Sequence, residues 1–385
     1  MLVLFSKGLA IGIILLFVGT CIIPVIAQDS EKTLPASRGH WLYVGGNGPG
    51  NYSWITDAAN DASDGDTIFV YNDSSPYYEK NILIVKSISL IGEDRNTTII
   101  DGMGGGNSDD VIHISANRVK VTGFTIRNCS GNDFDTGIYI KSPGKYFKDI
   151  KTVSNVNISG NIFIDTATGI LEFKTLHTII SGNTILSSGR LHNWTIIGFA
   201  PAFASSIITG NTILNPRAFG IYEQASHCLI EGNVISNGTQ PMSQWGIAQI
   251  SSSNRIIGNT ITKFWVGIAI SGFSSFNIIS QNNISNCTGT GIKFRPPVSI
   301  LTFITKNSIS QCGQYGIELY KSIFAVVKEN NFIDNNISAF FRDSIGARWV
   351  RNYWDDWNGT GPKIIQGYKL VNFDWHPAQI PYDIP

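Results

Sequence analysis

The stretches Ser159-Gly160-Asn161-Ile162 and Ser181-Gly182-Asn183-Thr184-Ile185 decide the fold, because this phrase returns through most of the chain. Its asparagines are separated by 22, 28, 22, 26, 23, 25, 23 and 22 residues. A repeat of this length indicates a solenoid built from stacked coils. The repeated asparagines are Asn161, Asn183, Asn211, Asn233, Asn259, Asn282, Asn307, Asn330 and Asn352.

A second phrase runs in step with the first and is typified by Gly137-Ile138-Tyr139-Ile140 and Gly316-Ile317-Glu318-Leu319. Apolar residues alternate in it with polar or small ones, which indicates short strands with one buried face. Each coil therefore contains at least two strands, and stacking pairs every strand with its copy in the next coil. The sequence predicts an all-β parallel β-helix.

The repeated asparagine has a structural role in this prediction. Asn tolerates a left-handed corner, and its side-chain amide can bond to the same amide about 4.8 Å away in the next coil. We therefore expect the series Asn161 to Asn352 to form an internal ladder of amides.

The N-terminus has the features of an export signal. Lys7 precedes an apolar run from Leu9 to Val25, and Val25-Ile26-Ala27 supplies a cleavage site. We expect a signal peptide over 1–27 and a linker over 28–39, with the body of the chain outside the cytoplasm. The apolar run could alternatively stay in place as a membrane anchor.

The remaining chain divides into a cap, a repeat region and a tail. Residues 40–105 are expected to hold the N-terminal cap and first coils, with a short amphipathic helix over Trp54–Ala62 that closes the end of the core. The repeats then cover 106–360, and 361–385 forms a C-terminal cap or tail.

These motifs resemble the right-handed parallel β-helix proteins of the pectin-lyase-like class, particularly the NosD-like and carbohydrate-binding and sugar-hydrolysis group. The resemblance rests on the repeated coils, on the opening Ala62 to Ile68, and on Asn352-Tyr353-Trp354-Asp355-Asp356-Trp357. It implies a right-handed single-stranded helix. It does not choose among the lyases, hydrolases, epimerases, adhesins and accessory proteins that share this fold.

Composition argues against nucleic acid as a partner. Lys and Arg total 28, Asp and Glu total 28, and charged residues make up 15% of the chain. A balanced chain of this kind offers no extended basic face.

Four residues are the catalytic candidates. Glu172 and Glu223 occupy the same place in their coils, and His177 and His227 each stand five residues before a repeat glycine. One coil separates each pair, so like residues should lie roughly 10 Å apart. Two carboxylates with histidines could perform acid–base chemistry on a glycan. The alternative is that these carboxylates are surface groups or bond to backbone amides.

Aromatic residues recur beside the coil glycines. Phe219, Trp245 and Tyr315 directly precede a glycine, Trp265 lies one place earlier, and Trp194 belongs to the longest coil. Exposed rings along one face would suit stacking on sugars, whereas packed rings would only cover the sheet.

An acidic group in the early coils is the candidate for calcium, since calcium takes oxygen ligands; its members are Asp109, Asp110, Asp133 and Asp135. No cofactor is expected to be required. Cys287 and Cys312 fall on adjacent coils and form either a disulfide or a pair of buried thiols. Copper, which the NosD resemblance raises, is not expected, because the histidines and methionines are few and scattered.

These observations favour a secreted or cell-surface protein that binds extracellular or envelope polysaccharide. The alternatives are a polysaccharide-active lyase, hydrolase or epimerase, and a structural surface or adhesion protein. A NosD-type maturation factor for a copper enzyme ranks below them. A membrane is expected as a partner only through an uncleaved N-terminal segment.

Overall fold

The computed structural model describes residues 39–103, 110–129, 135–144, 148–186, 194–199, 205–238 and 244–384. The chain divides into two units, Met1–Arg38 and Gly39–Pro385, and the second is the solenoid. The expected signal peptide and all but the last residue of the expected linker therefore lie outside the described residues. Among the helices of the described part, none has the length and apolar character to span a membrane.

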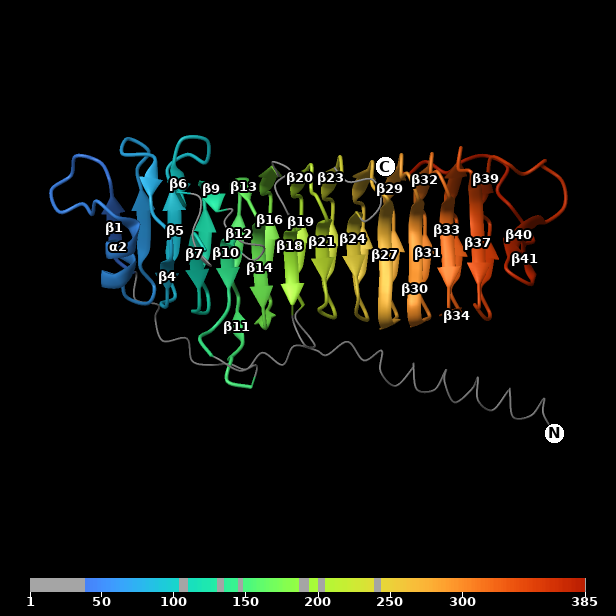
Figure 1. The fold of residues 1–385 in the computed structure, drawn as a ribbon, viewed down its shortest axis with the longest axis horizontal. Coiled ribbons are helices and arrows are strands. Elements are labelled where there is room, and N and C mark those ends of the chain that lie inside the picture. Colours follow the sequence, from blue (N-terminus) through green and yellow to red (C-terminus); the bar gives the residue numbers. More distant parts are fainter. Residues whose placement is uncertain are drawn as a thin grey trace. The chain divides into compact units, whose positions relative to one another are not determined.

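Each coil of the solenoid contributes strands to three faces, and successive coils pair in parallel along the whole unit (Figure 1). Face 1 contains β1 (Trp41–Val44), β2 (Thr67–Val70), β5 (Ser89–Gly92), β8 (Lys120–Thr122), β12 (Asn157–Ser159), β16 (Ile179–Ser181), β19 (Ile207–Thr209), β22 (Leu229–Glu231), β25 (Arg255–Ile257), β28 (Ile278–Ser280), β31 (Phe303–Thr305), β35 (Val326–Lys328), β38 (Arg348–Val350) and β41 (Val371–Asp374).

The chain then turns a corner into face 2, a sheet of 12 strands to which each coil contributes one strand. Its strands are β3 (Tyr77–Tyr78), β6 (Ile99–Asp101), β9 (Thr125–Cys129), β13 (Ile162–Thr166), β17 (Thr184–Leu186), β20 (Thr212–Leu214), β23 (Val234–Ser236), β26 (Thr260–Thr262), β29 (Asn283–Ser285), β32 (Ser308–Ser310), β36 (Asn331–Ile333) and β39 (Tyr353–Trp354).

Face 3 completes each coil and carries the Gly-Ile phrase. Its strands are β4 (Ile82–Ile84), β7 (Ile112–Ile114), β10 (Thr136–Ile140), β14 (Thr168–Phe173), β18 (Trp194–Phe199), β21 (Phe219–Glu223), β24 (Trp245–Gln249), β27 (Val266–Ser275), β30 (Thr290–Ile300), β33 (Tyr315–Tyr320), β37 (Ile337–Arg342) and β40 (Lys363–Gly367). Short extra pairings join β11 (Val153–Ser154) to β15 (Thr175–Leu176), and β34 (Ser322–Ile323) to β30.

Stacked aliphatic side chains fill the interior. On face 1 the register places one residue type in a column whose members are all 0% exposed: Ile158, Ile180, Ile208, Ile230, Ile256, Ile279 and Ile304. Burying one such side chain is worth roughly 1.5–3 kcal/mol. The columns hold the register, because a shift of one residue would turn every isoleucine outward.

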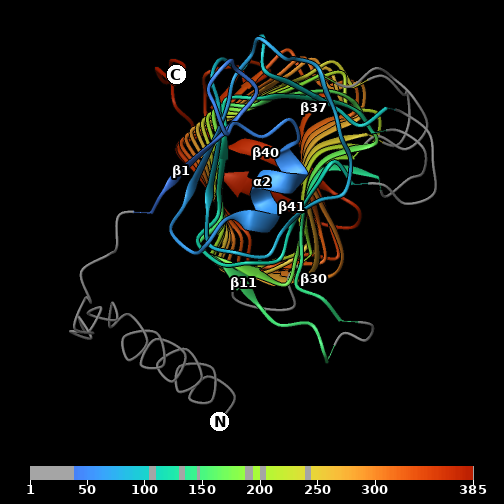
Figure 2. The same ribbon diagram turned by 90° about the vertical axis from the view of Figure 1, so that its left-hand side faces the viewer.

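A short helix closes the N-terminal end, as Figure 2 shows looking onto that end. Helix α2 (Ile55–Asp61) buries Ile55, Ala58 and Ala59 against the first coils. Its first two N–H groups donate to the Glu79 carboxylate, over 2.7 Å from Ile55 and 2.9 Å from Thr56. Glu79 thus supplies the cap that Trp54, the residue before the helix, does not provide.

An antiparallel hairpin closes the C-terminal end. Strands β40 and β41 pair with each other and extend faces 3 and 1 of the last coil. Below them Trp354 is 1% exposed, and its ring stacks on Phe332 with centroids 4.3 Å apart. The predicted parallel β-helix with an N-terminal capping helix is confirmed.

Candidate functional site

The repeated asparagines form one continuous ladder inside the corner between faces 1 and 2. In a typical rung, Asn233 N donates to Asn259 Oδ1 over 3.0 Å, and Asn233 Nδ2 donates to the same oxygen over 2.9 Å. Asn233 Nδ2 also donates to the Ile208 carbonyl of the preceding coil. The same pattern links every asparagine from Asn161 to Asn352, so the ladder is a structural feature.

An aspartate ends this ladder, which the repeat motif does not reveal. Asp374 Oδ2 accepts hydrogen bonds from Asn352 N over 2.8 Å, from Asn352 Nδ2 over 3.0 Å and from Trp354 Nε1 over 3.2 Å. Its other oxygen accepts from Arg351 N over 3.0 Å. Asp374 is 0% exposed. The last asparagine therefore meets a carboxylate where earlier ones meet another amide.

The two candidate catalytic carboxylates lie inside the solenoid, which contradicts the expectation that they act on a glycan and the alternative that they are surface groups. Glu172 and Glu223 are each 1% exposed. Both stand two residues after an inward isoleucine of face 3, at Ile170 and Ile221. The period of two in a strand therefore turns them inward as well. This phase is readable in the sequence from the two inward isoleucines, whereas coil position alone does not reveal it.

The candidate histidines lie on the other side of the wall. His177 and His227 are exposed and occupy left-handed corners, with φ of 55° and 62°. They share a corner position, since Thr178 and Cys228, which follow them, both point inward. The structure thus separates the four residues into two buried carboxylates and two exposed imidazoles, so they do not form the predicted acid–base site.

The two buried carboxylates converge on the coil between them. Gly198 is the partner of both glutamates in the register, and a β-carbon at Gly198 would overlap the Glu223 carboxylate. Glu172 Oε2 accepts from Thr175 Oγ1 over 2.6 Å and from Ser206 Oγ, in the Gly198 coil, over 3.1 Å. Burial and the Glu172 charge raise the pKa of Glu223 to about 8. Burial also raises the pKa of Glu172.

The outer side of face 3 carries most of the candidate sugar-binding rings in one register column. Trp194, Phe219 and Trp245 pair in successive coils, and Tyr315 occupies the same position three coils further on. The Phe219 and Trp245 rings meet edge to face at 5.3 Å. Phe219, Trp245 and Tyr315 are all half-buried, while the Trp194 side chain lies outside the described set.

Trp265 does not belong to this column. It precedes Val266, the residue that takes the column position in its coil. Its ring lies against Gly289, where a β-carbon would meet ring atoms at 3.0 and 3.1 Å. Trp265 therefore packs on a corner glycine, and its predicted place among the binding rings is not supported by the register.

Cations accompany the rings on the same outer surface. The Arg295 guanidinium carbon lies 4.7 Å from the centre of the Trp245 ring, two coils away. The Arg342 guanidinium carbon lies 3.9 Å from the Tyr320 ring. We call this surface the face 3 strip; it comprises Lys141, Phe173, Phe219, Tyr222, Trp245, Lys293, Arg295, Tyr315, Glu318, Tyr320, Phe340 and Arg342.

One carboxylate lies within the strip. Glu318 is 6% exposed, and its Oε2 is 2.8 Å from Lys293 Nζ. Its Oε1 is 3.8 Å from Arg342 Nη2. Lys293 and Glu318 directly follow an inward isoleucine in their coils, so their outward direction is also readable from the period of two. The sequence reading had missed both.

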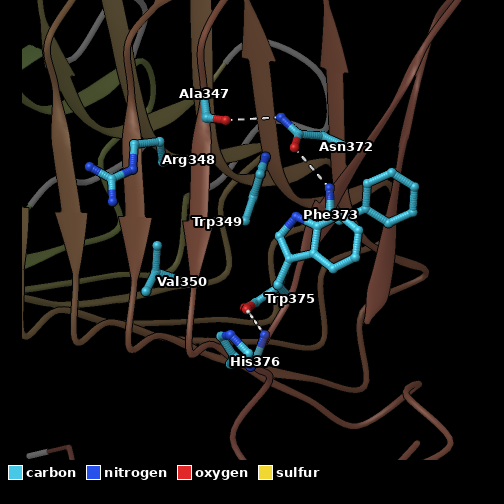
Figure 3. Close-up of a pocket in the computed structure, with 9 residues that line it drawn as sticks. Ala347, Arg348, Trp349, Val350, Asn372, Phe373, Trp375 and His376 are labelled. Carbon is cyan, nitrogen blue, oxygen red and sulfur yellow. Dashed lines mark hydrogen bonds between the residues drawn. The ribbon is translucent and has the colours of Figure 1, made fainter. Parts of the chain in front are cut away.

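A pocket of about 410 Å³ opens at the C-terminal end between β38 and β41 (Figure 3). Its walls include Arg348, Trp349 and Trp375, and the Trp375 ring lies 5.1 Å from that of Phe373. The pocket belongs to face 1 and the closing hairpin. It is therefore separate from the face 3 strip.

The acidic group proposed for calcium is only partly described. Asp110 Oδ1 accepts from Thr136 Oγ1 over 2.7 Å, and Asp110 Oδ2 is 3.7 Å from His113 Nδ1. Asp135 is 2% exposed, and Asp109 and Asp133 lie outside the described residues. Within the described ranges, no three or more His, Cys, Asp or Glu side chains gather as a metal site.

Comparison with known protein families gives two matches. A right-handed β-helix region is matched over residues 195–352. The family described as periplasmic copper-binding protein (NosD) is matched over residues 59–261, more than half of the chain. The chain belongs to the NosD family. A comparison with curated proteins found no match for this NosD-family protein.

Solved structures share the fold at low sequence identity. The DFA-IIIase of Arthrobacter chlorophenolicus A6 without its lid aligns with a TM-score of 0.65 and 14% identity, over 90% of this chain and 100% of that one. The A-module of the mannuronan C-5 epimerase AlgE4 of Azotobacter vinelandii aligns with a TM-score of 0.57 and 12% identity, over 85% and 91%. At these identities the likeness concerns the fold.

The residues described in this NosD-family protein do not fit a copper centre. Copper takes thiolate, thioether or imidazole donors gathered at one place, and the described part of the chain has no group of three or more His, Cys, Asp or Glu side chains. Cys287 and Cys312 are buried free cysteines, so the disulfide alternative is not adopted. A hydrogen bond with Cys312, together with burial, raises the pKa of the Cys287 thiol well above its usual value. Such a thiol is a poor metal ligand.

Proposed function

We propose that this protein is exported and binds a polysaccharide along the face 3 strip, and that no metal is required at the strip for this binding. The observation that carries the proposal is that half-buried rings recur in one register column on the outer side of face 3, and that guanidinium groups lie over rings there, Arg295 over Trp245 and Arg342 over Tyr320. A chain of sugar rings is an extended ligand with repeated apolar faces and polar edges. An extended, repeating surface is suited to such a ligand.

The rings supply stacking surfaces at several points of the strip. Phe219 contacts Trp245 at 5.3 Å and Tyr222 at 5.0 Å, and further along Tyr315 stacks on Phe340 at 5.1 Å. Aromatic pairs of this kind hold each other at a fixed orientation. The rigid β-helix beneath them keeps the two ring clusters at constant separation, so little entropy is lost when a stiff ligand binds.

The cations favour an acidic polysaccharide. Lys141, Lys293, Arg295 and Arg342 lie on the strip, against the single carboxylate Glu318. Arg295 is the exposed member of the set, and its guanidinium can bind a carboxylate or sulfate in a bidentate manner. Placement outside the cytoplasm is supported by the periplasmic NosD family description and by the apolar run after Lys7.

The test measures binding of the full exported chain to a panel of acidic and neutral polysaccharides, by affinity electrophoresis and by calorimetry. Trp245→Ala and Arg295→Ala should each weaken binding to the acidic ligand about tenfold or more. Arg295→Ala should also reduce the dependence of affinity on salt. Trp375→Ala is the matched control, because Trp375 is 64% exposed but lies at the C-terminal pocket. Equal losses in all three variants would contradict the proposal.

A carbohydrate-active enzyme is the second candidate, and one observation favours it. Glu318 lies in the strip itself, beside Lys293 and Arg342, with Tyr320 next along the strand face. A carboxylate, an amine and a phenol in one place are the groups that acid–base steps on a uronic acid or glycosidic bond require. The check is chromatography of each polysaccharide after incubation: product that disappears in Glu318→Gln would assign catalysis, and intact ligand would assign binding alone.

A further inference from the structure

The interior carboxylates Glu172 and Glu223 take no part in the proposed binding function and call for a separate explanation. They occupy an inward column of face 3 whose other members are apolar along most of the solenoid. The register gives this column as Ile140, Glu172, Gly198, Glu223, Gln249, Ile270 and Phe294. Three polar side chains therefore interrupt an aliphatic column, and the shortest residue lies between the two acids.

The two acids face the same small volume from opposite sides. Glu223 leans back over Gly198, in the place that a longer side chain would fill. Glu172 leans forward to the same coil, where Ser206 Oγ reaches its Oε2 over 3.1 Å. The absence of a side chain at Gly198 is what admits both carboxylates.

Several oxygens around this volume have no partner in the described part of the chain. They are Glu172 Oε1, Glu223 Oε2 and Gln249 Oε1, and Gln249 Nε2 shares this condition. The Thr178 hydroxyl lies beside the Glu172 carboxylate and opposes the rise in its pKa. Gln249 is 0% exposed and neighbours Glu223 in the column. Buried polar atoms are nearly always paired, and unpaired ones in a native interior commonly mark an ion or a water.

Charge leads to the same conclusion. Two ionised carboxylates in a dry interior repel each other and lose their hydration, and each such loss is large. A shared proton would remove part of the charge. It would supply no partner for Gln249 Oε1, which is a buried acceptor. A cation neutralises the pair and binds the free oxygens together.

We propose that the solenoid holds a calcium ion or a similar hard divalent cation in its interior, between Glu172 and Glu223 and beside Gln249. All of the donor atoms are oxygens, which calcium and magnesium prefer over softer metals. Two carboxylates balance a divalent charge. Calcium takes about six to eight oxygens with flexible geometry, so it tolerates mixed carboxylate, amide and hydroxyl ligands.

The position of the ion has a consequence for its exchange. The site is enclosed by the coil wall, since all three side chains are at most 1% exposed. The cation therefore enters as the chain folds, and a chelator added to the folded protein removes it slowly. Metal binding to the native state alone stabilises that state by mass action.

The experiment uses the full chain, unfolded with a chelator and refolded in metal-free buffer with or without millimolar calcium. Elemental analysis of the gel-filtered protein should find about one calcium per chain, and the melting temperature should rise by about 5 °C or more with calcium. The double variant Glu172→Gln, Glu223→Gln should lose both effects. Glu231→Gln is the matched control, because Glu231 lies on the next strand along the chain, β22, but is exposed.

A second variant covers the case in which the double variant does not fold. Gln249→Met keeps the length of the side chain and removes its oxygen, so it should weaken calcium binding about tenfold while folding normally. Absence of bound metal, with one melting temperature in chelator and in calcium, would overturn the proposal in favour of a shared proton. The polysaccharide assays do not depend on this result, so the two proposals fail separately.

Discussion

Two columns of buried polar side chains run through the same interior and differ in how their atoms are paired. In the asparagine ladder each amide meets an identical amide in the next coil, and both donors and the acceptor have partners. In the column of Glu172, Gly198, Glu223 and Gln249 the residue type changes at every step, and atoms of all three polar side chains have no partner in the described region.

The difference shows what repetition achieves in a solenoid. If an amide can hydrogen-bond to an identical amide one coil away, every copy of that amide in the stack has a partner. Adding coils to a polar ladder therefore leaves no further buried polar group unpaired. A polar residue that appears in only a few coils has no copy to bond with. It must find another partner, and here we infer that the partner is a cation.

The largest expected effect comes from breaking the ladder at its middle. Asn259→Ala removes the acceptor of Asn233 N and Nδ2 and the donor to the Ile230 carbonyl. Because each buried group left unpaired costs about 1–3 kcal/mol, we expect a loss of about 3–4 kcal/mol of unfolding free energy. Urea unfolding measures it. Asn283→Ala, at a half-buried outward position close by, should change stability by less than about 1 kcal/mol.

The next effect tests the end of the ladder. Asp374→Asn replaces one acceptor oxygen with an NH2 group, which is a donor. Both carboxylate oxygens of Asp374 accept hydrogen bonds, one from Asn352 and Trp354 and the other from Arg351, so the new NH2 group would face an N–H donor. We expect a loss of about 2–3 kcal/mol. Asp383→Asn is the control, since Asp383 is exposed near the same end. Unchanged thermal unfolding of Asp374→Asn would show that the ladder does not need a charged terminus.

A third variant tests the volume between the two acids. Gly198→Ala places a methyl group where the Glu223 carboxylate lies, so we expect a loss of about 2 kcal/mol from overpacking. In a Glu223→Ala background that volume is free, and the same substitution should cost much less. A double-mutant cycle by urea unfolding measures the coupling. Additive losses would mean that the carboxylate does not fill the Gly198 position.

The smallest expected effect is a dependence of stability on pH that arises from the glutamate column and not from the asparagine ladder. Burial and the Glu172 charge raise the pKa of Glu223 to about 8 from the ordinary 4.5, so the folded state holds a proton that the unfolded state releases. That stability is full below pH 4.5 and is lost as pH rises through 8. In chelator, unfolding free energy should fall by about 1.4 kcal/mol between pH 7 and 9. Glu223→Gln should remove this fall, whereas a rise with pH would contradict the assignment.

The fold could be predicted from the sequence because the repeat states the same local rule many times. Asparagine at each corner and isoleucine at each inward position agree on one register, and a single exception does not disturb it. The aromatic column was recognisable for the same reason, since Phe219, Trp245 and Tyr315 share a place before the coil glycine.

The site was harder to predict because its residues occur once. Coil position aligns Glu172 with Glu223 but does not give their direction, which their phase relative to Ile170 and Ile221 turns inward. Arg295 reaches Trp245 across two coils, a contact set by side-chain length rather than by sequence pattern. Asp374 ends the ladder without any repeat motif around it.

The asparagine ladder also has a direction. Every rung donates toward the C-terminal neighbour and accepts from the N-terminal one, so amide dipoles add along the row and leave their positive end at Asn352. An acid residue sits at that pole. Duplicating a coil within the row would preserve the head-to-tail order of donors and acceptors. Appending a coil beyond Asp374 would instead place the side-chain oxygen of its asparagine against the Asp374 carboxylate, so that two acceptors would face each other. A lineage could therefore lengthen this protein by internal duplication far more readily than by growth at its tail.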